Sequence, residues 1–315
     1  MRAWRYDAFG PIATMVRLAE IAQPRPGRGQ VVVRVHHASI NPLDWKLVEG
    51  EFRLLFKSKP PAGIGTEFSG VVEAIGSGVT TPAVGTPVVG YIDPMLRPPG
   101  ALQECVAVDA RTVLPIEAAE LPVACTLPMA GTSALQMCRL GEVRSGHRVL
   151  VHGAAGGVGS FAVQVVRALG ARPVATGSRQ SQAFIAELQP EAQVDYSSQR
   201  IERWGGPFDV VLDCASTLGS QDAGVLLANG GAYVRTLPAF PSLLFDPLLN
   251  RLRPIKRHAL RLRPNPDDLR TLLGWMRRGR LGPRVTERFA FANALKALEL
   301  SHSGRARGKL VVQVA

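Results

Sequence analysis

One glycine-rich turn constrains the fold of this chain more than any other stretch. The apolar run Arg148 to His152 predicts a buried strand, and from Phe161 to Gly170 apolar residues recur at helical spacing until a glycine ends the pattern. The turn between them, Gly153 to Gly159, contains four glycines. A strand, a glycine turn and a helix in this order form a βα unit of a parallel α/β sheet.

The same turn indicates a binding site. Ala154, Gly156 and Gly159 fit the G-x-G-x-x-G fingerprint, with alanine in its first position. Such a turn lets backbone N–H groups approach a pyrophosphate, and the helix N-terminus adds a partial positive charge. We therefore expect a dinucleotide cofactor, and a glycine turn without a ligand is the alternative.

The residues after the next strand bear on which dinucleotide binds. The run Arg172 to Thr176 predicts that strand, and NAD-binding chains usually carry an acidic residue at its end. Here Ser178 and Arg179 follow, and the first carboxylate is Glu187. A hydroxyl and a guanidinium suit a 2′-phosphate, so the sequence predicts NADPH rather than NADH. A solvated loop charge is the alternative reading of Arg179.

Length and composition exclude several classes of protein. A chain of 315 residues exceeds the usual size of one domain, so one large or two coupled domains are expected. No apolar run reaches about 18 residues, and the first residues lack the apolar core of a secretion signal. We therefore expect no membrane span and a cytoplasmic location. The four cysteines form no CxxC pair, which is typical of reduced thiols rather than of a zinc lobe.

The net charge of +12 raises the question of a polyanionic partner. Basic residues are scattered along the chain, with one cluster between Arg251 and Arg263. This cluster has no interleaved aromatic residues, so we expect a solvated rim or an electrostatic funnel for a phosphate-rich cofactor rather than a nucleic-acid site.

The pattern of apolar residues changes from strand-like to helical near residue 116. Before it, short β-type runs bounded by Gly or Pro predict a folded-over antiparallel barrel. After it, helical periodicity over 127–140 leads into strands that alternate with helices, which predicts a doubly wound parallel sheet. The predicted strands are 30–36, 70–75, 84–91, 148–152, 172–176, 194–196, 208–214, 231–237, 258–262 and 310–314, with a helix at 267–280.

Five segments together carry a resemblance to a known family. They are Ala38 to Asp44 with Lys46 and Gly50 following, Gly65 to Gly76, Leu127 to Leu135, the glycine turn, and Gly304 to Val312, and the short run Val194 to Tyr196 is a sixth piece. With these motifs the chain resembles, nearly end to end, a zinc-independent medium-chain dehydrogenase/reductase of the quinone oxidoreductase (zeta-crystallin-like) family.

The resemblance implies an α/β architecture of two domains. A GroES-like β-rich barrel domain would comprise residues 1–115 and 264–315 and bind the substrate, and a Rossmann domain with a doubly wound parallel sheet would comprise residues 116–263 and bind NADPH. Members usually form homodimers through the last Rossmann strand, here expected near 258–262.

The resemblance also implies a chemistry. Asn41 and Thr66 stand where zinc-dependent relatives carry zinc ligands, so no metal is expected, and Glu67 is interpreted as structural. The implied reaction transfers a hydride from NADPH to a quinone or an α,β-unsaturated carbonyl, whose developing charge delocalises onto oxygen.

Individual roles follow by position in the family pattern. Asn41 is assigned to orientation and hydrogen bonding near the reacting groups, and Asp44 to anchoring its loop or capping a turn. Phe52 stands near the position at which enoyl thioester reductases carry a tyrosine, so it predicts an apolar substrate pocket. Whether Lys46 or Asp44 takes part in proton transfer is left open. The expected cofactor contacts are Thr132, Ala155, Gly156, Gly157, Val158, Ser178, Arg179, Tyr196 and Lys309.

Two other functions remain open at this point. One is an enoyl thioester reductase or a biosynthetic tailoring reductase, against which the missing tyrosine counts. The other is a non-catalytic NADPH-binding protein with an RNA-binding or sensor role that uses the basic cluster.

Overall fold

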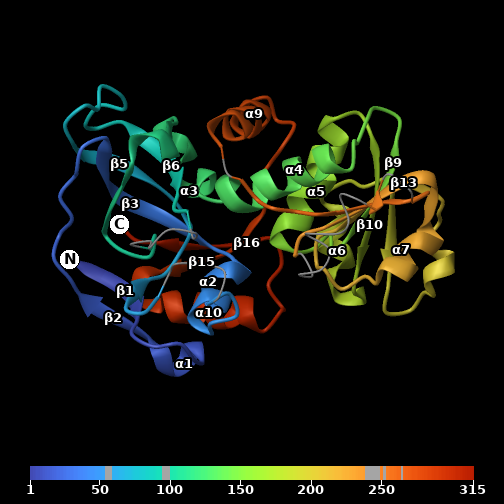
Figure 1. The fold of residues 1–315 in the computed structure, drawn as a ribbon, viewed down its shortest axis with the longest axis horizontal. Helices are drawn as coiled ribbons and strands as arrows, with labels where there is room; N and C mark the ends of the chain where they lie inside the picture. The colour runs from blue at the N-terminus through green and yellow to red at the C-terminus, as the bar shows by residue number, and fades with distance from the viewer. Residues whose placement is uncertain (54–58, 94–99, 238–248, 251–252, 264) are drawn as a thin grey trace. The chain divides into compact units, whose positions relative to one another are not determined.

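The computed structural model describes residues 1–53, 59–93, 100–237, 249–250, 253–263 and 265–315 (Figure 1). The chain divides into two compact units. The first comprises Met1–Met129, Pro264–Leu273 and Val285–Ala315, and the second comprises Ala130–Arg263 and Gly274–Arg284. Arg251, one end of the basic cluster, lies outside the described residues.

These units differ at two places from the expected domains. The GroES-like domain was expected to comprise 1–115 and 264–315, and the Rossmann domain 116–263. The first unit continues to Met129 because side chains of its sheet hold this segment: Ser69 Oγ donates to the Leu121 carbonyl, and Glu67 accepts from the Met129 N–H. Residues 274–284 join the second unit, where the Gln164 side chain accepts from the Gly282 N–H.

The first unit is β-rich, as the sequence predicts. Its larger sheet has the order β15-β16-β3-β5-β6-β8, with β7 paired to β3, and its smaller sheet the order β2-β1-β4. The final strand β16 pairs antiparallel with β3, so the end of the chain completes the N-terminal sheet. Alternate side chains of β3, such as Val31, Val33 and Val35, are fully buried and form part of its core. The strands are β1 Arg2–Tyr6, β2 Val16–Glu20, β3 Gln30–Ile40, β4 Ala62–Gly63, β5 Glu67–Ile75, β6 Pro87–Tyr91, β7 Cys105–Asp109, β8 Val113–Pro115, β15 Val285–Ala290 and β16 Lys309–Gln313.

Short helices connect these strands. They are α1 Ile12–Met15, α2 Pro42–Val48, α3 Leu121–Ala124, α9 Pro266–Arg277 and α10 Ala294–His302. The turn from β3 into α2 begins at Asn41 and is followed by Pro42, which suits the first position of a helix because its missing N–H has no helical partner there.

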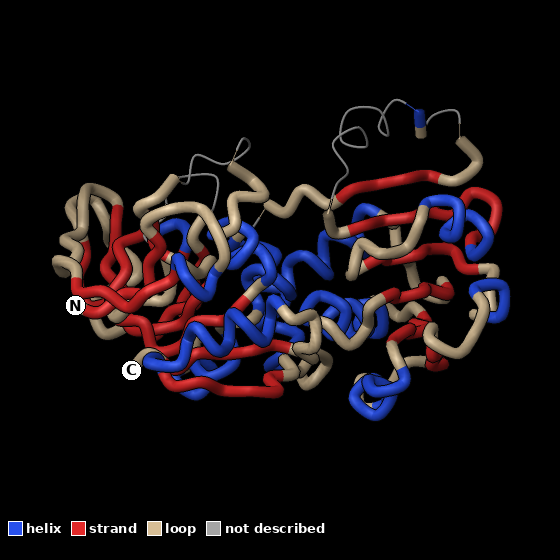
Figure 2. The backbone as a smooth tube through the Cα atoms, turned by 90° about the horizontal axis from the view of Figure 1, so that it is seen from below, coloured by secondary structure: helices blue, strands red, loops and turns tan. Residues whose placement is uncertain are grey.

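The second unit contains a six-stranded parallel sheet of order β11-β10-β9-β12-β13-β14. This is the doubly wound order, with the central strand β9 at the point where the connections reverse direction. Figure 1 shows α4 and α5 on one side of the sheet and α7 on the other, and Figure 2 shows the strands side by side. The elements are α4 Thr132–Leu140, β9 Arg148–His152, α5 Gly157–Ala168, β10 Arg172–Gly177, α6 Gln182–Ala186, β11 Ala192–Asp195, β12 Phe208–Asp213, α7 Ser220–Leu226, β13 Leu227–Arg235 and β14 Lys256–Ala259.

The last Rossmann strand lies earlier in the chain than predicted. The sequence places it at 258–262, and the structure has β14 at Lys256–Ala259. An edge strand rich in charged residues carries no clear apolar alternation, so its start cannot be recognised from pattern alone.

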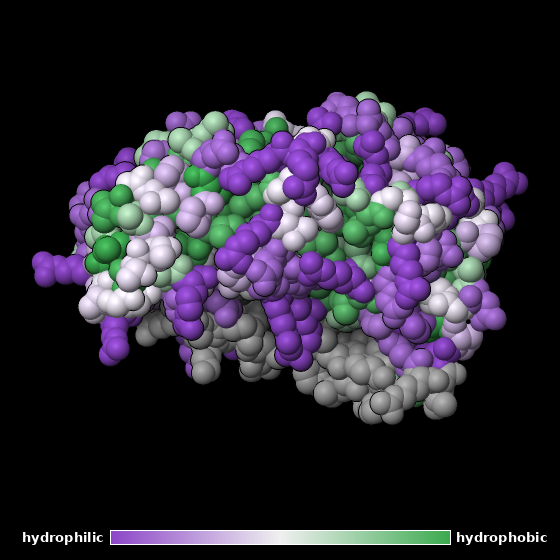
Figure 3. Space-filling view, turned by 90° about the horizontal axis from the view of Figure 1, so that it is seen from above, coloured by the Kyte–Doolittle hydropathy of each residue, from purple (hydrophilic) through white to green (hydrophobic). Residues whose placement is uncertain are grey.

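The surface is mixed in polarity. On the face seen in Figure 3, hydrophilic side chains form several separate groups with apolar surface between them. Among the described residues, no helix combines the length and the apolar character needed to cross a membrane.

Candidate cofactor site and buried polar cluster

The glycine turn after β9 has a backbone that larger residues would disturb. Gly153 has a φ of +73°, a left-handed conformation that favours glycine. A Cβ at Gly159 would lie 2.2 Å from the Gly153 carbonyl oxygen, so the first turn of α5 packs directly against the end of β9. Both glycines are therefore required by this turn as it is built.

The N-terminus of α5 offers backbone donors. Its first helical hydrogen bond runs from the Ser160 N–H to the Gly156 carbonyl, so the N–H groups of Gly157, Val158 and Gly159 precede it and have no partner inside the helix. Among the described residues, the nearest atom to a Cβ built at Gly156 is the Gly153 carbonyl oxygen at 3.5 Å, an ordinary contact. The turn that contains Ala155 thus fits the pyrophosphate of a dinucleotide in donors and in space.

The residues predicted around a 2′-phosphate lie at two adjacent strand ends. Gly177 at the end of β10 pairs in register with Asp195 at the end of β11, and the Tyr196 N–H donates to the Gly177 carbonyl at 3.2 Å. Ser178 and Arg179 follow Gly177 directly. The sheet therefore brings Ser178, Arg179 and Tyr196 to one edge.

Asp195 places a carboxylate at this edge that the sequence pattern does not reveal. The Arg179 Nε atom lies 3.7 Å from the Asp195 Oδ2 atom. Asp195 follows Arg179 by sixteen positions and belongs to the next strand, so a search for an acidic residue after β10 does not find it. The signal that could have found it is the pairing of the two predicted strands, because parallel strands in register place the residue at the end of β11 beside the residues that follow β10.

His152, the last residue of β9, is buried beneath this edge. Its Nδ1 lies 2.8 Å from Thr176 Oγ1 and its Nε2 lies 2.9 Å from Thr217 Oγ1. Burial lowers the pKa of His152, which favours the neutral ring, and the ring packs 5.7 Å from that of Tyr196. Thr132, expected near the nicotinamide, is the buried first residue of α4.

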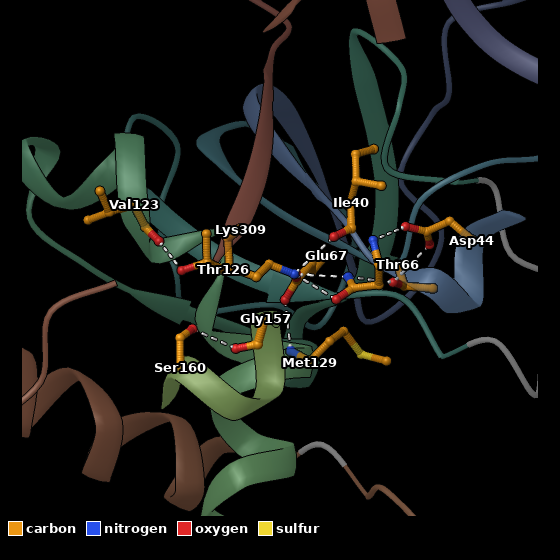
Figure 4. A network of polar contacts seen from close by, with 11 residues as sticks. Ile40, Asp44, Thr66, Glu67, Val123, Thr126, Met129, Gly157, Ser160 and Lys309 are labelled. Carbon is orange, nitrogen blue, oxygen red and sulfur yellow. Dashed lines mark hydrogen bonds and ion pairs between the residues drawn. The ribbon is translucent and has the colours of Figure 1, made fainter. Parts of the chain in front are cut away.

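In the first unit, a lysine forms the centre of a buried polar cluster (Figure 4). The Lys309 side chain at the start of β16 is 2% exposed, and that of Glu67 is fully buried. The Lys309 Nζ atom donates to the Ile40 carbonyl at 3.0 Å, to Asn41 Oδ1 at 2.7 Å and to Glu67 Oε1 at 3.0 Å. These bonds occupy all three donors of the ammonium group, so the expectation that Lys309 reaches a cofactor phosphate does not fit its place.

Asn41 is held by the same cluster. Its Nδ2 donates to Glu67 Oε1 at 2.8 Å and lies 3.4 Å from Thr66 Oγ1. Lysine can only donate and an ionised carboxylate can only accept. The Asn41 amide must therefore turn its oxygen toward Lys309 and its nitrogen toward Glu67. Because both Nδ2 hydrogens are committed, Asn41 holds the β3–α2 turn in place rather than donating to an acceptor substrate.

Asp44 stabilises the same β3–α2 turn through its side chain. It accepts from the Asn41 backbone N–H at 2.7 Å and from Thr66 Oγ1 at 3.1 Å, forming a capping box with Asn41 at the start of α2. Burial raises the pKa of Asp44 to about 7, against the opposing effect of these two hydrogen bonds. Both its anchoring and its capping roles are therefore present in the structure.

Two further candidates lie near the end of α2. Lys46 Nζ pairs with Glu51 at 2.6 Å and lies 4.8 Å from the centre of the Trp45 ring. Phe52 is half-buried in the turn after Gly50. The structure thus gives Lys46 an ion-pair partner in Glu51.

The residues of the cluster do not suit zinc. Zinc in proteins prefers thiolate, imidazole and carboxylate ligands in sets of three or four. Here a backbone carbonyl, an amide oxygen and the Glu67 carboxylate surround an ammonium group, which repels a metal cation. In the part of the chain that the structure describes, no group of three or more His, Cys, Asp and Glu residues is arranged to hold a metal ion.

Comparison with known families connects the two units to one architecture. The family described as alcohol dehydrogenase GroES-like domain matches residues 27–118, and the family described as zinc-binding dehydrogenase matches residues 190–312. The first match lies in the β-rich unit, and the second runs from the parallel sheet to the final strand. The chain belongs to the medium-chain dehydrogenase/reductase family.

Relatives of this dehydrogenase/reductase include quinone oxidoreductases. It is 26% identical over 325 residues to the chloroplast envelope quinone oxidoreductase homolog of Arabidopsis thaliana, covering 99% of this chain and 98% of the relative. It is 28% identical to the NADPH-dependent alkenal/one oxidoreductase, chloroplastic, of the same plant, covering 99% and 79%. The quinone oxidoreductase from Coxiella burnetii superposes with a TM-score of 0.88 at 28% identity, covering 100% and 99%. The predicted fold class and the predicted medium-chain dehydrogenase/reductase family are thus confirmed.

Proposed function

We propose that this dehydrogenase/reductase is an NADPH-dependent enzyme that reduces a quinone or an α,β-unsaturated carbonyl compound without zinc. The observation that carries the proposal is the N-terminus of α5, where backbone donors follow a glycine turn, at the same end of the sheet as Arg179. Backbone donors with a guanidinium at the adjacent strand end form a receptor for a dinucleotide with an extra phosphate.

The proposed substrate class is supported by two of the relatives. One is named a quinone oxidoreductase and another an alkenal/one oxidoreductase, and both kinds of acceptor delocalise negative charge onto an oxygen. Such acceptors need little electrophilic assistance, so their reduction does not require a zinc ion. The polar cluster, whose central cation is the Lys309 ammonium, is consistent with such a reaction. Bound NADPH would supply the hydride.

The residues of this chain then have distinct tasks. The α5 donors and Arg179 hold the cofactor's phosphates, and Tyr196 lies beside the 2′-phosphate. Asn41, Asp44 and their buried partners keep the β3–α2 turn in one conformation, so that it does not need to reorganise during the reaction. Phe52 contributes an apolar wall to the acceptor pocket.

The first test is turnover by the purified protein. We expect NADPH oxidation with benzoquinones, naphthoquinones or enones, and a slower reaction with NADH. The same panel includes a crotonyl thioester, and turnover of that compound alone would replace our proposal by a thioester reductase. Tight NADPH binding with no turnover on any acceptor would instead favour a non-catalytic role.

A further inference from the structure

Asp195 is built into the edge where the 2′-phosphate would lie. Its Oδ1 accepts from the Ser197 N–H at 2.9 Å and from the Ser197 hydroxyl, and its Oδ2 accepts from Ser198 Oγ at 3.0 Å. These bonds, led by those from Ser197, lower the pKa of Asp195. The carboxylate therefore stays ionised and cannot rotate away from this edge without losing its partners.

Arg179 is the less constrained member of the ion pair. Its side chain is 84% exposed, whereas that of Asp195 is 13% exposed. The 3.7 Å between Arg179 Nε and Asp195 Oδ2 exceeds a normal hydrogen bond, so the two groups attract each other without a tight contact. An ion pair whose guanidinium is exposed and not in tight contact is weak, and a phosphate can compete for the guanidinium.

The same pair affects the two cofactors in opposite directions. A 2′-phosphate that binds Arg179 is placed beside a fixed negative charge, and like charges at short distance weaken binding. The ribose of NADH carries a 2′-hydroxyl instead, and a carboxylate at this edge is the group that usually accepts from it. Asp195 is thus unfavourable for NADPH and neutral or favourable for NADH.

We propose that Asp195 is a specificity-determining residue that limits the preference for the 2′-phosphate, so that this enzyme uses NADH as well as NADPH. This inference rests on the proposed function, because it requires the cofactor to bind at the ends of β9, β10 and β11. It extends that function by giving the site two opposite charges. Arg179 attracts the 2′-phosphate, and Asp195 repels it.

Binding of two cofactor fragments to the full-length protein tests the inference without turnover. The probes are adenosine 2′,5′-bisphosphate and 5′-AMP, which differ only by the 2′-phosphate, and calorimetry measures both dissociation constants. We expect Asp195→Asn to tighten binding of the bisphosphate by about fivefold or more without tightening 5′-AMP. Arg179→Ala should weaken the bisphosphate to the level of 5′-AMP.

The matched control is Glu142→Gln. It removes one negative charge from the same unit, at an exposed position that precedes β9 and so lies at the opposite end of the parallel strands. We expect this variant to bind both probes as the wild type does. An equal gain in Glu142→Gln and Asp195→Asn would show a general charge effect and overturn the inference.

Two further outcomes separate the inference from the proposed function. If Arg179→Ala weakens the bisphosphate and Asp195→Asn leaves it unchanged or weakens it, Asp195 supports Arg179 and the inference is wrong while NADPH binding stands. If neither probe binds to the wild type, the proposed cofactor site is wrong and the inference fails with it.

Discussion

Asp44 shows how burial changes the chemistry of one residue. The sequence alone assigns Asp44 to anchoring its loop or capping a turn, and it gives no sign of a shifted pKa. In the structure it is fully enclosed, and burial raises its pKa to about 7 even though Asn41 and Thr66 donate to it. The folded protein therefore retains a proton on Asp44 at a pH where the unfolded chain, with a pKa of about 3.9, has released it.

The free energy of unfolding should fall as the pH rises from about 4 to about 7 and should not change further through this group above that range. We predict that Asp44→Asn removes this dependence, so that the stability of the variant relative to the wild type improves by about 2 kcal/mol between pH 5 and pH 8. Urea unfolding at both values measures it.

Asp7→Asn, at an exposed aspartate paired with Arg17 in the same unit, is the control and should show no such gain. Parallel profiles for the wild type and Asp44→Asn would contradict the assignment of the shifted pKa to Asp44.

The unit formed by β9, the glycine turn and α5 is the element that could be predicted best. β9 spans Arg148–His152, as the apolar run indicates, because a central strand buried on both faces is apolar throughout. α5 begins at Gly157, four residues before the predicted helical pattern, because its first turn is made of glycines and small residues that carry no periodicity.

Gly159→Ala tests the packing of this element. A Cβ there would lie 2.2 Å from the Gly153 carbonyl oxygen, so α5 must move away from β9. We predict a loss of about 1–3 kcal/mol in the free energy of unfolding and weaker NADPH binding, because the α5 donors move with the helix. Thermal unfolding and NADPH fluorescence titration measure the two effects.

Gly274→Ala in α9 is the matched control. The atoms nearest to a Cβ at this position, among the described residues, belong to the flexible guanidinium end of Arg278, so the usual helix preference for alanine should stabilise the protein by up to about 1 kcal/mol. Equal effects of the two substitutions would show that the close approach at Gly159 is unimportant.

At the scale of the whole molecule, self-association through β14 has an obstacle that the sequence does not reveal. The Leu260 N–H donates to Arg235 of β13, so the alternating backbone groups of Arg257 face away from the sheet. The Asn250 side chain accepts from the Arg257 N–H at 2.8 Å and donates to its carbonyl at 2.7 Å. Asn250 thus covers the edge on which the expected homodimer would form.

We predict that Asn250→Ala strengthens self-association, because it frees both backbone groups of Arg257 for a second chain. Sedimentation velocity over a range of protein concentrations measures it, with Asn229→Ala, at an exposed residue of β13, as the control. A wild type and an Asn250→Ala variant that sediment alike would show that no dimer uses this edge.

Local pattern was sufficient for the β-rich first part, the parallel α/β sheet and the glycine turn, because strand and helix periodicity and glycine conformations are set by neighbouring residues. The division into a GroES-like and a Rossmann domain came from the family resemblance. The sequence does not predict the strands β1, β2, β4, β7, β8 and β15, since each is short or mostly exposed. Only the tertiary structure placed Asp195 beside Arg179, and it brought Lys309 to Glu67 across 242 positions of sequence. A buried charge must find an opposite charge once water is excluded, and which one it finds depends on the pairing of strands that are distant in the chain.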